Sequence, residues 1–584
     1  MKKRILIISK LRSKSLKNKK SNFLFYNEGC RLFKIDKDFN YKKFKNNSIV
    51  NYRLNKKDLI KDYKYLSQVY EIYLENIYKK LNTIHNINYS KKEWRILIGP
   101  WLFMFMSILF DNLKKLEFIN KNCSIKHVEI AKNNKSIFPF KNYIDFSYSS
   151  LTDRFNNQIN LDLIKFLKKF KVKLIPYSQR NNFIKSFNIY FYIKTFLYNK
   201  IFIILNYVNF VFKNVITNYV VFHRPYFNSI INVLVQIKLK QFPIFYKSPI
   251  ITTSHCLNLK IRKEKLKNFN SKFLNIVNHL FFKYIPLSYV ENFQEHVRTV
   301  EKINWPKNPR YIFSDNSFFY DDFFKFWLVS KKKLNCKFVC GQHGGSFYIS
   351  RYNFQESHQY KISDEVVTWG YKNKNCQQLF NYKILGRKVK LHPRGNLLIV
   401  NYEMPRFSML NNIYTNMIYS EYLERQLSFI KNINKDIFCK IVFRNYPVNF
   451  GRNVSEVVKD AYPNILFDKN KRLDDSLNQS RLCYVNLNST VYLETFSLNF
   501  PTIICFDKKI DLVRNDAKKY FKVLEKVGVY YDNHQLAAEK INKIWNNVDE
   551  WWSSKKVQSA VAYFCNRYAK RSYNPLNELA DFFK

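Results

Sequence analysis

Short apolar runs alternate with longer segments of helical periodicity over most of this chain. Such runs predict β-strands, and apolar residues that recur every three or four positions predict the helices between them. After a first strand close to Met1, the predicted strands of the first part are Lys126–Ile130, Val172–Pro176, Tyr219–Phe222, Tyr311–Ser314 and Lys337–Cys340. Strands that alternate with helices favour parallel sheets, so this part is predicted to be α/β.

A second array of the same kind starts near residue 391. Its predicted strands are Leu397–Asn401, Cys439–Arg444, Asn464–Phe467, Leu482–Val485 and Thr502–Phe506. A chain of 584 residues is too long for one hydrophobic core. We therefore predict two Rossmann-like domains that face each other across a cleft, residues 1–390 with helical insertions and residues 391–547, with extra helices at both ends. Residues 548–584 are predicted to be helices that pack back across both domains.

The chain is strongly basic, because 99 Lys and Arg against 44 Asp and Glu give a formal charge of +55. A nucleic-acid-binding protein is one interpretation of such a balance. The lysines, however, are spread along the whole chain among Asn, Ile, Tyr and Phe, which is typical of a codon bias. We expect no nucleic-acid partner; the charge favours contact with an anionic membrane or with anionic substrates.

One apolar segment, Ile96–Phe110, resembles a membrane span. Gly99-Pro100 interrupts it, and it is shorter than a bilayer crossing requires, so a buried helix is predicted. We expect a cytoplasmic protein, with any contact to the inner face of the cytoplasmic membrane being peripheral.

The most informative motif is Gln342-His343-Gly344-Gly345, which directly follows the predicted strand ending at Cys340 and the next residue, Gly341. In parallel α/β sheets ligands bind at the carboxyl ends of the strands. His343 is predicted to act as a general acid or base or to donate to a phosphate, while Gln342, Gly344 and Gly345 line the cleft. The alternative is a turn whose histidine caps a helix.

Asn488, Ser489 and Thr490 stand between a predicted strand and a helical pattern. Hydroxyls and unsatisfied backbone N–H groups at the start of a helix make a candidate anion site, which suits a donor phosphate. Glu494, one turn further on, is a candidate for binding a ribose hydroxyl. The alternative is an ordinary helix cap.

Arg444 ends another predicted strand and is followed by Tyr446 and Pro447. A guanidinium at this edge is a candidate phosphate clamp, and the proline fixes the loop that follows. The alternative is a surface arginine in a turn.

Two carboxylates lie near the end of the strand Tyr311–Ser314, namely Asp315 and Asp321. In the same cleft as His343, either would serve as a base or as a covalent nucleophile in sugar transfer. Either one alternatively only caps the helix that follows. Asp321-Asp322 is adjacent rather than spaced, and Cys336 and Cys340 lack further ligands, so no metal is expected.

Weaker candidates complete the predicted site. Those for the sugar or the cleft are Glu356, Asp364 and Trp369, although a tryptophan is more often a core residue. Those for the acceptor side are Arg95, Glu129 and Arg224.

Taken in order, these motifs resemble a family of bacterial surface-polysaccharide transferases from O-antigen gene clusters. The resemblance spans about Trp94 to Pro501 and is carried by Trp94–Trp101, Gln342–Gly345, Ile362–Asp364 with Thr368–Gly370, Arg444–Pro447 and Asn488–Thr495. More distantly, the chain is similar to GT-B transferases that use CMP-activated 2-keto sugar acids and carry a His-Pro and a Ser-Ser/Thr motif at the cytidine phosphate. Ser489-Thr490 matches the second motif, whereas Tyr446-Pro447 stands in place of His-Pro.

The resemblance implies a GT-B glycosyltransferase with an acceptor-side first domain and a nucleotide-sugar-binding second domain. It implies transfer of Kdo or another nonulosonic acid from CMP to a glycan or lipid-linked glycan, for lipopolysaccharide O-antigen or capsule, without a metal or other cofactor. Arg444, Ser489 and Thr490 would hold the phosphate. Asp315 is the first match and Asp321 the second for a nucleophile, and His343 either binds the sugar carboxylate or relays a proton.

Three alternatives remain open at this point. The chain is a GT-B transferase that uses a UDP- or GDP-sugar or another activated donor, a basic nucleic-acid-binding protein, or a sugar-binding protein without catalysis.

Overall fold

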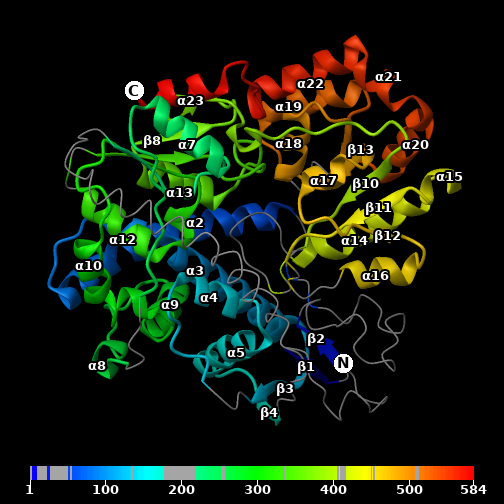
Figure 1. Ribbon diagram of the computed structural model, residues 1–584. Helices are drawn as coiled ribbons and strands as arrows, with labels where there is room; N and C mark the ends of the chain where they lie inside the picture. The colour runs from blue at the N-terminus through cyan, green and yellow to red at the C-terminus, as the bar shows by residue number, and fades with distance from the viewer. Residues whose placement is uncertain are drawn as a thin grey trace.

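In the computed structural model the described residues are 3–8, 23–26, 50, 52, 56–132, 136–176, 219–251, 257–332, 334, 336–403, 405, 407, 416–448, 450, 454–506 and 512–584. They form three parallel β-sheets with helices packed around them (Figure 1).

The first sheet has four strands in the order β2-β1-β3-β4, with β1 (Arg4–Ile7), β2 (Phe23–Phe25), β3 (Ile125–Lys132) and β4 (Val172–Pro176). Between β2 and β3 the chain forms two long helices, α2 (Lys56–His85) and α3 (Lys91–Asn122). A capping box starts α3, because Ser90 Oγ accepts from the Glu93 N–H while the Glu93 carboxylate accepts from the Ser90 N–H.

Helix α3 is the predicted buried helix, and it runs through Pro100. Among the described residues it is the one helix long and apolar enough to cross a membrane by length and composition. Its most apolar window is wholly buried inside the protein, which is the environment of a core helix.

The second sheet has five strands that lie side by side in chain order, β5 (Val220–Phe222), β6 (Tyr311–Ser314), β7 (Lys337–Gly341), β8 (Glu365–Thr368) and β9 (Gln377–Gln378). The first 390 residues therefore contain two separate sheets, whereas one Rossmann-like unit was predicted. Period and composition identify strands, but they do not say which strands pair, and β1–β4 pair among themselves.

The third sheet has the order β12-β11-β10-β13-β14-β15. Its strands are β10 (Asn396–Val400), β11 (Ile441–Arg444), β12 (Leu466–Phe467), β13 (Ser480–Val485), β14 (Thr502–Cys505) and β15 (Tyr530–Tyr531). Numbered from β10, this is the 3-2-1-4-5-6 order of the Rossmann fold, whose ligand crevice opens where the order reverses, here between β10 and β13. The predicted α/β class with parallel sheets is thus confirmed, and the second part of the chain has a Rossmann-like sheet.

The other helices surround these sheets. In the first two thirds of the chain they are α4 (Tyr143–Ser150), α5 (Asp153–Leu167), α7 (Ser229–Lys238), α8 (Leu259–Arg262), α9 (Lys272–Tyr284), α10 (Phe293–Lys302), α11 (Ser317–Tyr320), α12 (Asp322–Lys331) and α13 (Phe354–Ile362). Around the third sheet they are α14 (Asn416–Lys431), α15 (Lys435–Phe438), α16 (Val454–Ala461), α17 (Leu473–Leu477), α18 (Thr490–Ser497), α19 (Asn515–Lys526) and α20 (His534–Ile544).

The end of the chain crosses from the third sheet back to the second in α21 (Val548–Ser553), α22 (Lys555–Tyr568) and α23 (Pro575–Phe583), along the top of Figure 1. The Phe583 ring lies 5.1 Å from that of Phe222 and 5.6 Å from that of Phe313, both on the second sheet. These helices join the two halves through buried aromatic contacts.

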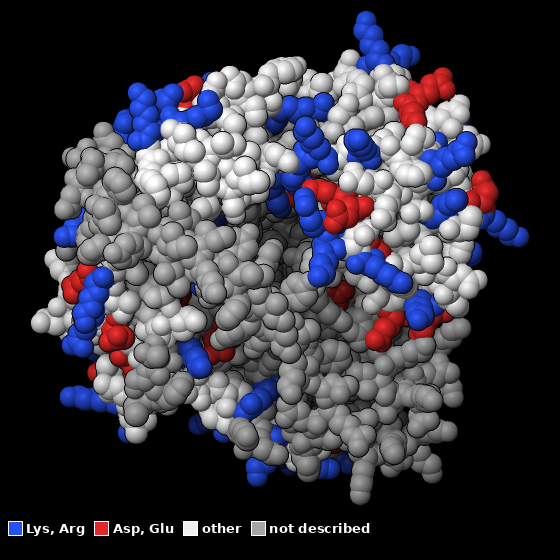
Figure 2. Space-filling view, viewed as in Figure 1, with Lys and Arg blue, Asp and Glu red and all other residues white. Residues whose placement is uncertain are grey.

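Figure 2 shows the charged side chains on the described part of one face of the protein. Lys and Arg side chains lie singly or in small groups over this face, with Asp and Glu among them. This pattern fits the even spread of lysine along the sequence.

Candidate active site

Asp315 and His343 come from the carboxyl ends of two neighbouring strands. Asp315 directly follows β6, and His343 follows β7 by two residues. Because Ser314 pairs with Cys340 in parallel register, both ends reach the same sheet edge. Gly341 makes the approach possible, since a Cβ there would lie 2.0 Å from Asp315 Oδ1.

The Asp315 carboxylate is fully buried and well bonded. Oδ1 accepts from the Tyr382 hydroxyl at 2.6 Å, and Oδ2 accepts from the Tyr226 backbone N–H at 2.7 Å. Burial raises the pKa of Asp315 to about 7, although these hydrogen bonds and the charge of Lys383 oppose the rise. Asp315 therefore changes its charge near neutral pH, which suits a proton acceptor or a nucleophile.

His343 is paired through Nδ1 with the hydroxyl of Tyr226. Burial, and to a smaller extent the positive charge of Lys383, lower the pKa of His343 to about 4. The imidazole is therefore neutral at pH 7.

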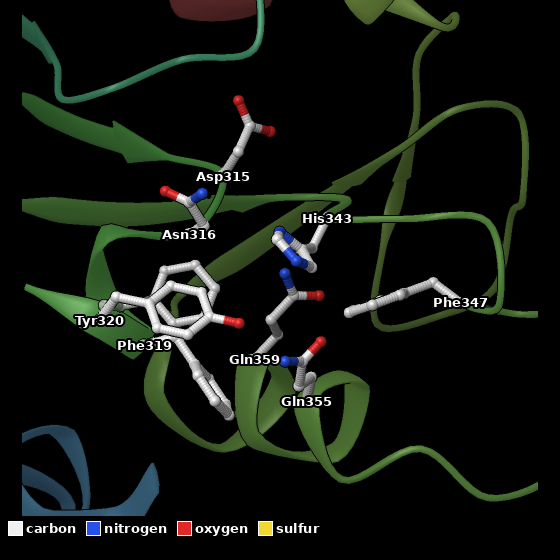
Figure 3. Close-up of a pocket in the computed structure, with 9 residues that line it drawn as sticks. Asp315, Asn316, Phe319, Tyr320, His343, Phe347, Gln355 and Gln359 are labelled. Carbon is white, nitrogen blue, oxygen red and sulfur yellow. The ribbon is translucent and has the colours of Figure 1, made fainter. Parts of the chain in front are cut away.

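Asp315 and His343 both line a small pocket, and in Figure 3 the Asp315 carboxylate points away from the imidazole. The empty volume of the pocket is about 170 Å³, and its lining consists of Asp315, Asn316, Phe318, Phe319, Tyr320, His343, Phe347, Gln355 and Gln359. The amides of Gln355 and Gln359, both from α13, face the imidazole of His343 in Figure 3. Pockets for whole drug-sized ligands are ~300–1,000 Å³, so at most one small group of a ligand fits here.

The loop that carries His343 touches the third sheet's helix α18. The Gly345 N–H donates to Thr490 Oγ1 at 3.1 Å, and a Cβ on Gly345 would lie 2.3 Å from the Ser489 carbonyl oxygen. Gly344 also faces Thr490. The structure thus brings together the two motifs that were predicted to form opposite walls of one cleft.

Ser489 precedes α18 as its N-cap but makes no side-chain cap bond. Its Oγ is buried and has no hydrogen-bond partner within the described part of the chain. It follows β13, on one side of the crevice where the strand order reverses. Asn488 has a packing role, because its amide donates to Ser350 Oγ and its oxygen accepts from the Tyr492 hydroxyl.

Glu494 is held in an ion-pair network instead of being open to a ribose. Its carboxylate pairs with Lys383 at 2.8 Å and with Arg387 at 2.5 Å, and Arg387 also pairs with Asp474. Burial favours the neutral carboxyl, yet the two cations keep the pKa of Glu494 below its usual value. The network places the Lys383 ammonium 5.2 Å from the ring centre of Tyr226, next to the catalytic candidates.

Arg444 likewise has its charge satisfied within the protein. Its guanidinium pairs with the buried carboxylate of Asp468 and donates to Ser476 Oγ and to the carbonyl oxygen of Asn470. The predicted phosphate clamp is therefore a structural ion pair in this fold, because its charge is already matched. Tyr446, just before Pro447, is 40% exposed and packs at 5.4 Å from the ring of Tyr402.

Asp321, the second candidate nucleophile, is the N-cap of α12. It accepts from the Phe324 N–H at 3.1 Å and from the Ser248 hydroxyl at 2.7 Å, and it is absent from the lining of the His343 pocket. This is the capping role that the sequence left open for it. Arg224 lies 3.5 Å from it, two residues before Tyr226.

Four further candidates have structural contacts in or around the second sheet. Asp364 precedes β8 and accepts from the Phe338 N–H, at the opposite edge of the sheet from His343. Gln342 accepts from the Trp369 N–H at 2.8 Å, and Trp369 is fully buried. Glu356 accepts from the Tyr348 N–H and pairs with Arg514, which links this half to α19 of the third sheet.

The remaining acceptor-side candidates, Arg95 and Glu129, lie on the first sheet and the helices next to it. Arg95 on α3 forms a two-pronged ion pair with Glu71 of α2. Glu129 is buried on β3 with His127 at 3.3 Å. Neither residue lines the His343 pocket.

Sequence reasoning missed five residues of the site, Tyr226, Gln359, Tyr382, Lys383 and Gly341. Tyr226 follows β5 and Gly341 ends β7, so their places at strand ends were a usable signal. Tyr382 and Lys383 lie on the short 3₁₀ turn η5 (Tyr382–Ile384), and Gln359 lies inside α13. No spacing rule points to these three, because they reach the site through tertiary packing.

No group of three or more His, Cys, Asp or Glu side chains suited to a metal occurs among the residues described. The site consists of one carboxylate, one imidazole, amides and tyrosines, with the start of α18 beside them.

Several solved glycosyltransferases have a similar chain path. MurG of Acinetobacter baumannii is 8% identical, with a TM-score of 0.31 and coverage of 63% of this chain and 99% of its own. A glycosyltransferase of Rickettsia africae is 11% identical, with a TM-score of 0.35 and coverage of 63% and 98%. WaaG, a glycosyltransferase involved in lipopolysaccharide biosynthesis, is 8% identical, with a TM-score of 0.27 and coverage of 63% and 100%. These TM-scores are below 0.5, so the fold assignment rests on the sheet order of this chain.

No curated protein matches this chain. A family pattern, by contrast, covers almost all of it, from residue 4 to residue 583. The chain belongs to the LIC12162 family of transferases.

Proposed function

We propose that this transferase is a glycosyltransferase that moves a 2-keto acid sugar, Kdo or another nonulosonic acid, from CMP to a bacterial surface glycan. The observation that carries the proposal is the contact between the Gly344–Gly345 loop and the start of α18. It puts a Rossmann crevice, a usual place for a nucleotide, next to a pocket with a titrating carboxylate.

The nucleotide part and the sugar part of the donor bind at two neighbouring places. The cytidine phosphate lies at the start of α18, where backbone N–H groups and the hydroxyls of Ser489 and Thr490 offer hydrogen bonds to an anion. One small group of the acidic sugar enters the pocket beside Asp315 and His343, while the rest of the sugar stays outside it. Arg444 takes no part in binding the donor, because Asp468 already neutralises its charge.

Asp315 supplies the chemistry at the anomeric carbon. As the bond from that carbon to the CMP oxygen breaks, its electron pair leaves with CMP and positive charge develops on the sugar, which a nearby carboxylate stabilises. The acceptor hydroxyl oxygen forms the new bond, and its proton passes to Asp315 if configuration is inverted. If configuration is retained, the Asp315 carboxylate first bonds to the anomeric carbon as CMP leaves. The acceptor hydroxyl oxygen then displaces Asp315 from that carbon, and its proton passes to the phosphate of the departing CMP. The proposal requires no metal.

The acceptor is a glycan or a lipid-linked glycan for lipopolysaccharide or capsule. We place the protein in the cytoplasm, with peripheral contact to the anionic inner face of the membrane through its excess of positive charge. We propose no nucleic-acid partner, in line with the dispersed charges of Figure 2.

The test is a donor screen with the purified chain. Purified protein is incubated with CMP-, UDP- and GDP-sugars and with glycan acceptors, and mass spectrometry detects the product while the released nucleotide is identified. Transfer with release of CMP is expected, and the Asp315→Asn variant serves as the inactive control. Release of UDP or GDP would establish the alternative donor class, and absence of transfer from every donor would contradict the proposal.

A further inference from the structure

Tyr226 contacts both candidate catalytic groups at once. Its backbone N–H donates to Asp315 Oδ2, and its hydroxyl pairs with His343 Nδ1. The amide nitrogen of Asn316 approaches the same hydroxyl oxygen at 3.4 Å. One residue in the loop after β5 therefore connects the ends of β6 and β7.

The hydrogen bonds of this hydroxyl determine where the proton of His343 lies. An amide nitrogen only donates, so the Tyr226 oxygen accepts from Asn316. Burial and the charge of Asp315 raise the pKa of Tyr226 well above its ordinary value, so its O–H keeps its hydrogen. Among the described residues, Nδ1 of His343 is the acceptor that lies within reach of this hydrogen, which points to a ring proton on Nε2.

We propose that Tyr226 fixes His343 as a neutral imidazole protonated on Nε2, which donates a hydrogen bond to the substrate and does not take a proton from it. Tyr226 is then a positioning residue, and the base or nucleophile of the site is Asp315. This inference assigns a single role to His343, for which the sequence left both anion binding and proton relay open.

The pocket contains an acceptor that complements this donor. Gln359 is fully buried and uses its amide nitrogen to donate to the Gly341 carbonyl oxygen at 2.7 Å. Its Oε1 is buried and has no partner among the described residues. A ligand group that both accepts from His343 Nε2–H and donates to Gln359 Oε1, such as a sugar hydroxyl, would satisfy both.

The first experiment measures the tautomer without any substrate, so its outcome does not depend on the proposed function. NMR of ¹⁵N-histidine-labelled protein, with His343 assigned through His343→Gln, reports which ring nitrogen carries the proton. The wild type is expected to carry it on Nε2, with the imidazole neutral down to about pH 4. In Tyr226→Phe the acceptor role of Nδ1 is lost, so the pKa of His343 is expected to rise and both tautomers to be populated.

Tyr382→Phe is the matched control, because its hydroxyl bonds only to Asp315 among the two catalytic groups. It should leave the His343 tautomer unchanged. The proposal is overturned if wild-type His343 carries its proton on Nδ1, or if Tyr226→Phe leaves both the tautomer and the pKa unchanged.

The second experiment uses turnover once a donor is known. Glutamine offers an N–H near the position of Nε2 but cannot take up a proton. His343→Gln should therefore retain activity within about 10-fold of wild type, whereas His343→Ala should lose about 100-fold or more, the scale for one lost donor. Equal losses in the two variants, with an altered pH profile in His343→Gln, would show that His343 transfers a proton.

Discussion

Asp315 and Arg444 are both charged residues at the ends of parallel strands, but the folded protein neutralises only the charge of Arg444. Asp315 follows β6, and Arg444 ends β11. The Asp315 carboxylate is fully buried and forms no ion pair among the described residues. Burial therefore raises its pKa to about 7, although two hydrogen bonds from neutral groups oppose the rise. Arg444 has a carboxylate partner, Asp468. A charged strand end is a candidate for chemistry where the protein leaves its charge unmatched.

The strongest test of this comparison is Asp315→Asn, which keeps the shape of the side chain but removes its charge. Turnover should fall on the order of 10³-fold, the usual scale for a base. The substitution should leave the protein folded, as judged by circular dichroism. Steady-state transfer rates measure the loss.

The pH dependence of the wild-type rate shows whether Asp315 acts in its ionised or its protonated form. If the carboxylate acts ionised, kcat/KM rises about tenfold per pH unit below pH 7 and levels off above it, because the pKa of Asp315 is about 7. A rate that instead falls through pH 7 would show that Asp315 acts as an acid and would reverse its role.

For Arg444 the comparison predicts a loss of stability. Arg444→Met leaves Asp468 buried without its cation, so the free energy of unfolding should fall by about 3 kcal/mol in urea titrations. The double variant with Asp468→Asn should recover part of this loss, since no unpaired charge then remains. The folded fraction should turn over at a rate within a few-fold of wild type.

The opposite result for Arg444→Met would show that Arg444, like Asp315, is part of the functional site. If Arg444→Met leaves the free energy of unfolding unchanged but raises KM for the donor, Arg444 binds phosphate as first predicted.

Much of the fold followed from the sequence, because buried parallel strands leave continuous apolar runs such as Leu397–Val400 and Ile503–Cys505. Strand-end position also identified Asp315, His343 and Ser489. What it could not supply was the pairing of charges across distant segments. Arg444 meets Asp468 and Glu494 meets Lys383 only after folding, and both pairs occupy groups that the sequence left available for a ligand.

The contact between the His343 loop and the start of α18 is tested by two glycine substitutions, for which we expect the smallest loss of stability. In Gly345→Ala the new methyl group would lie 2.3 Å from the Ser489 carbonyl oxygen and 2.7 Å from the Thr490 nitrogen, and backbone atoms cannot rotate away. The free energy of unfolding should fall by about 2 kcal/mol, as for other overpacked sites, and the donor KM should rise because the start of α18 is displaced.

Gly344→Ala is the control within the same loop. Its nearest neighbour is Thr490 Oγ1 at 3.3 Å, a side-chain atom that needs to move by only a few tenths of an ångström. It should therefore cost less stability and less donor affinity than Gly345→Ala. Equal effects of the two substitutions in urea titration and donor KM would mean that the loop does not rest on α18, and the shared cleft would lose its main support.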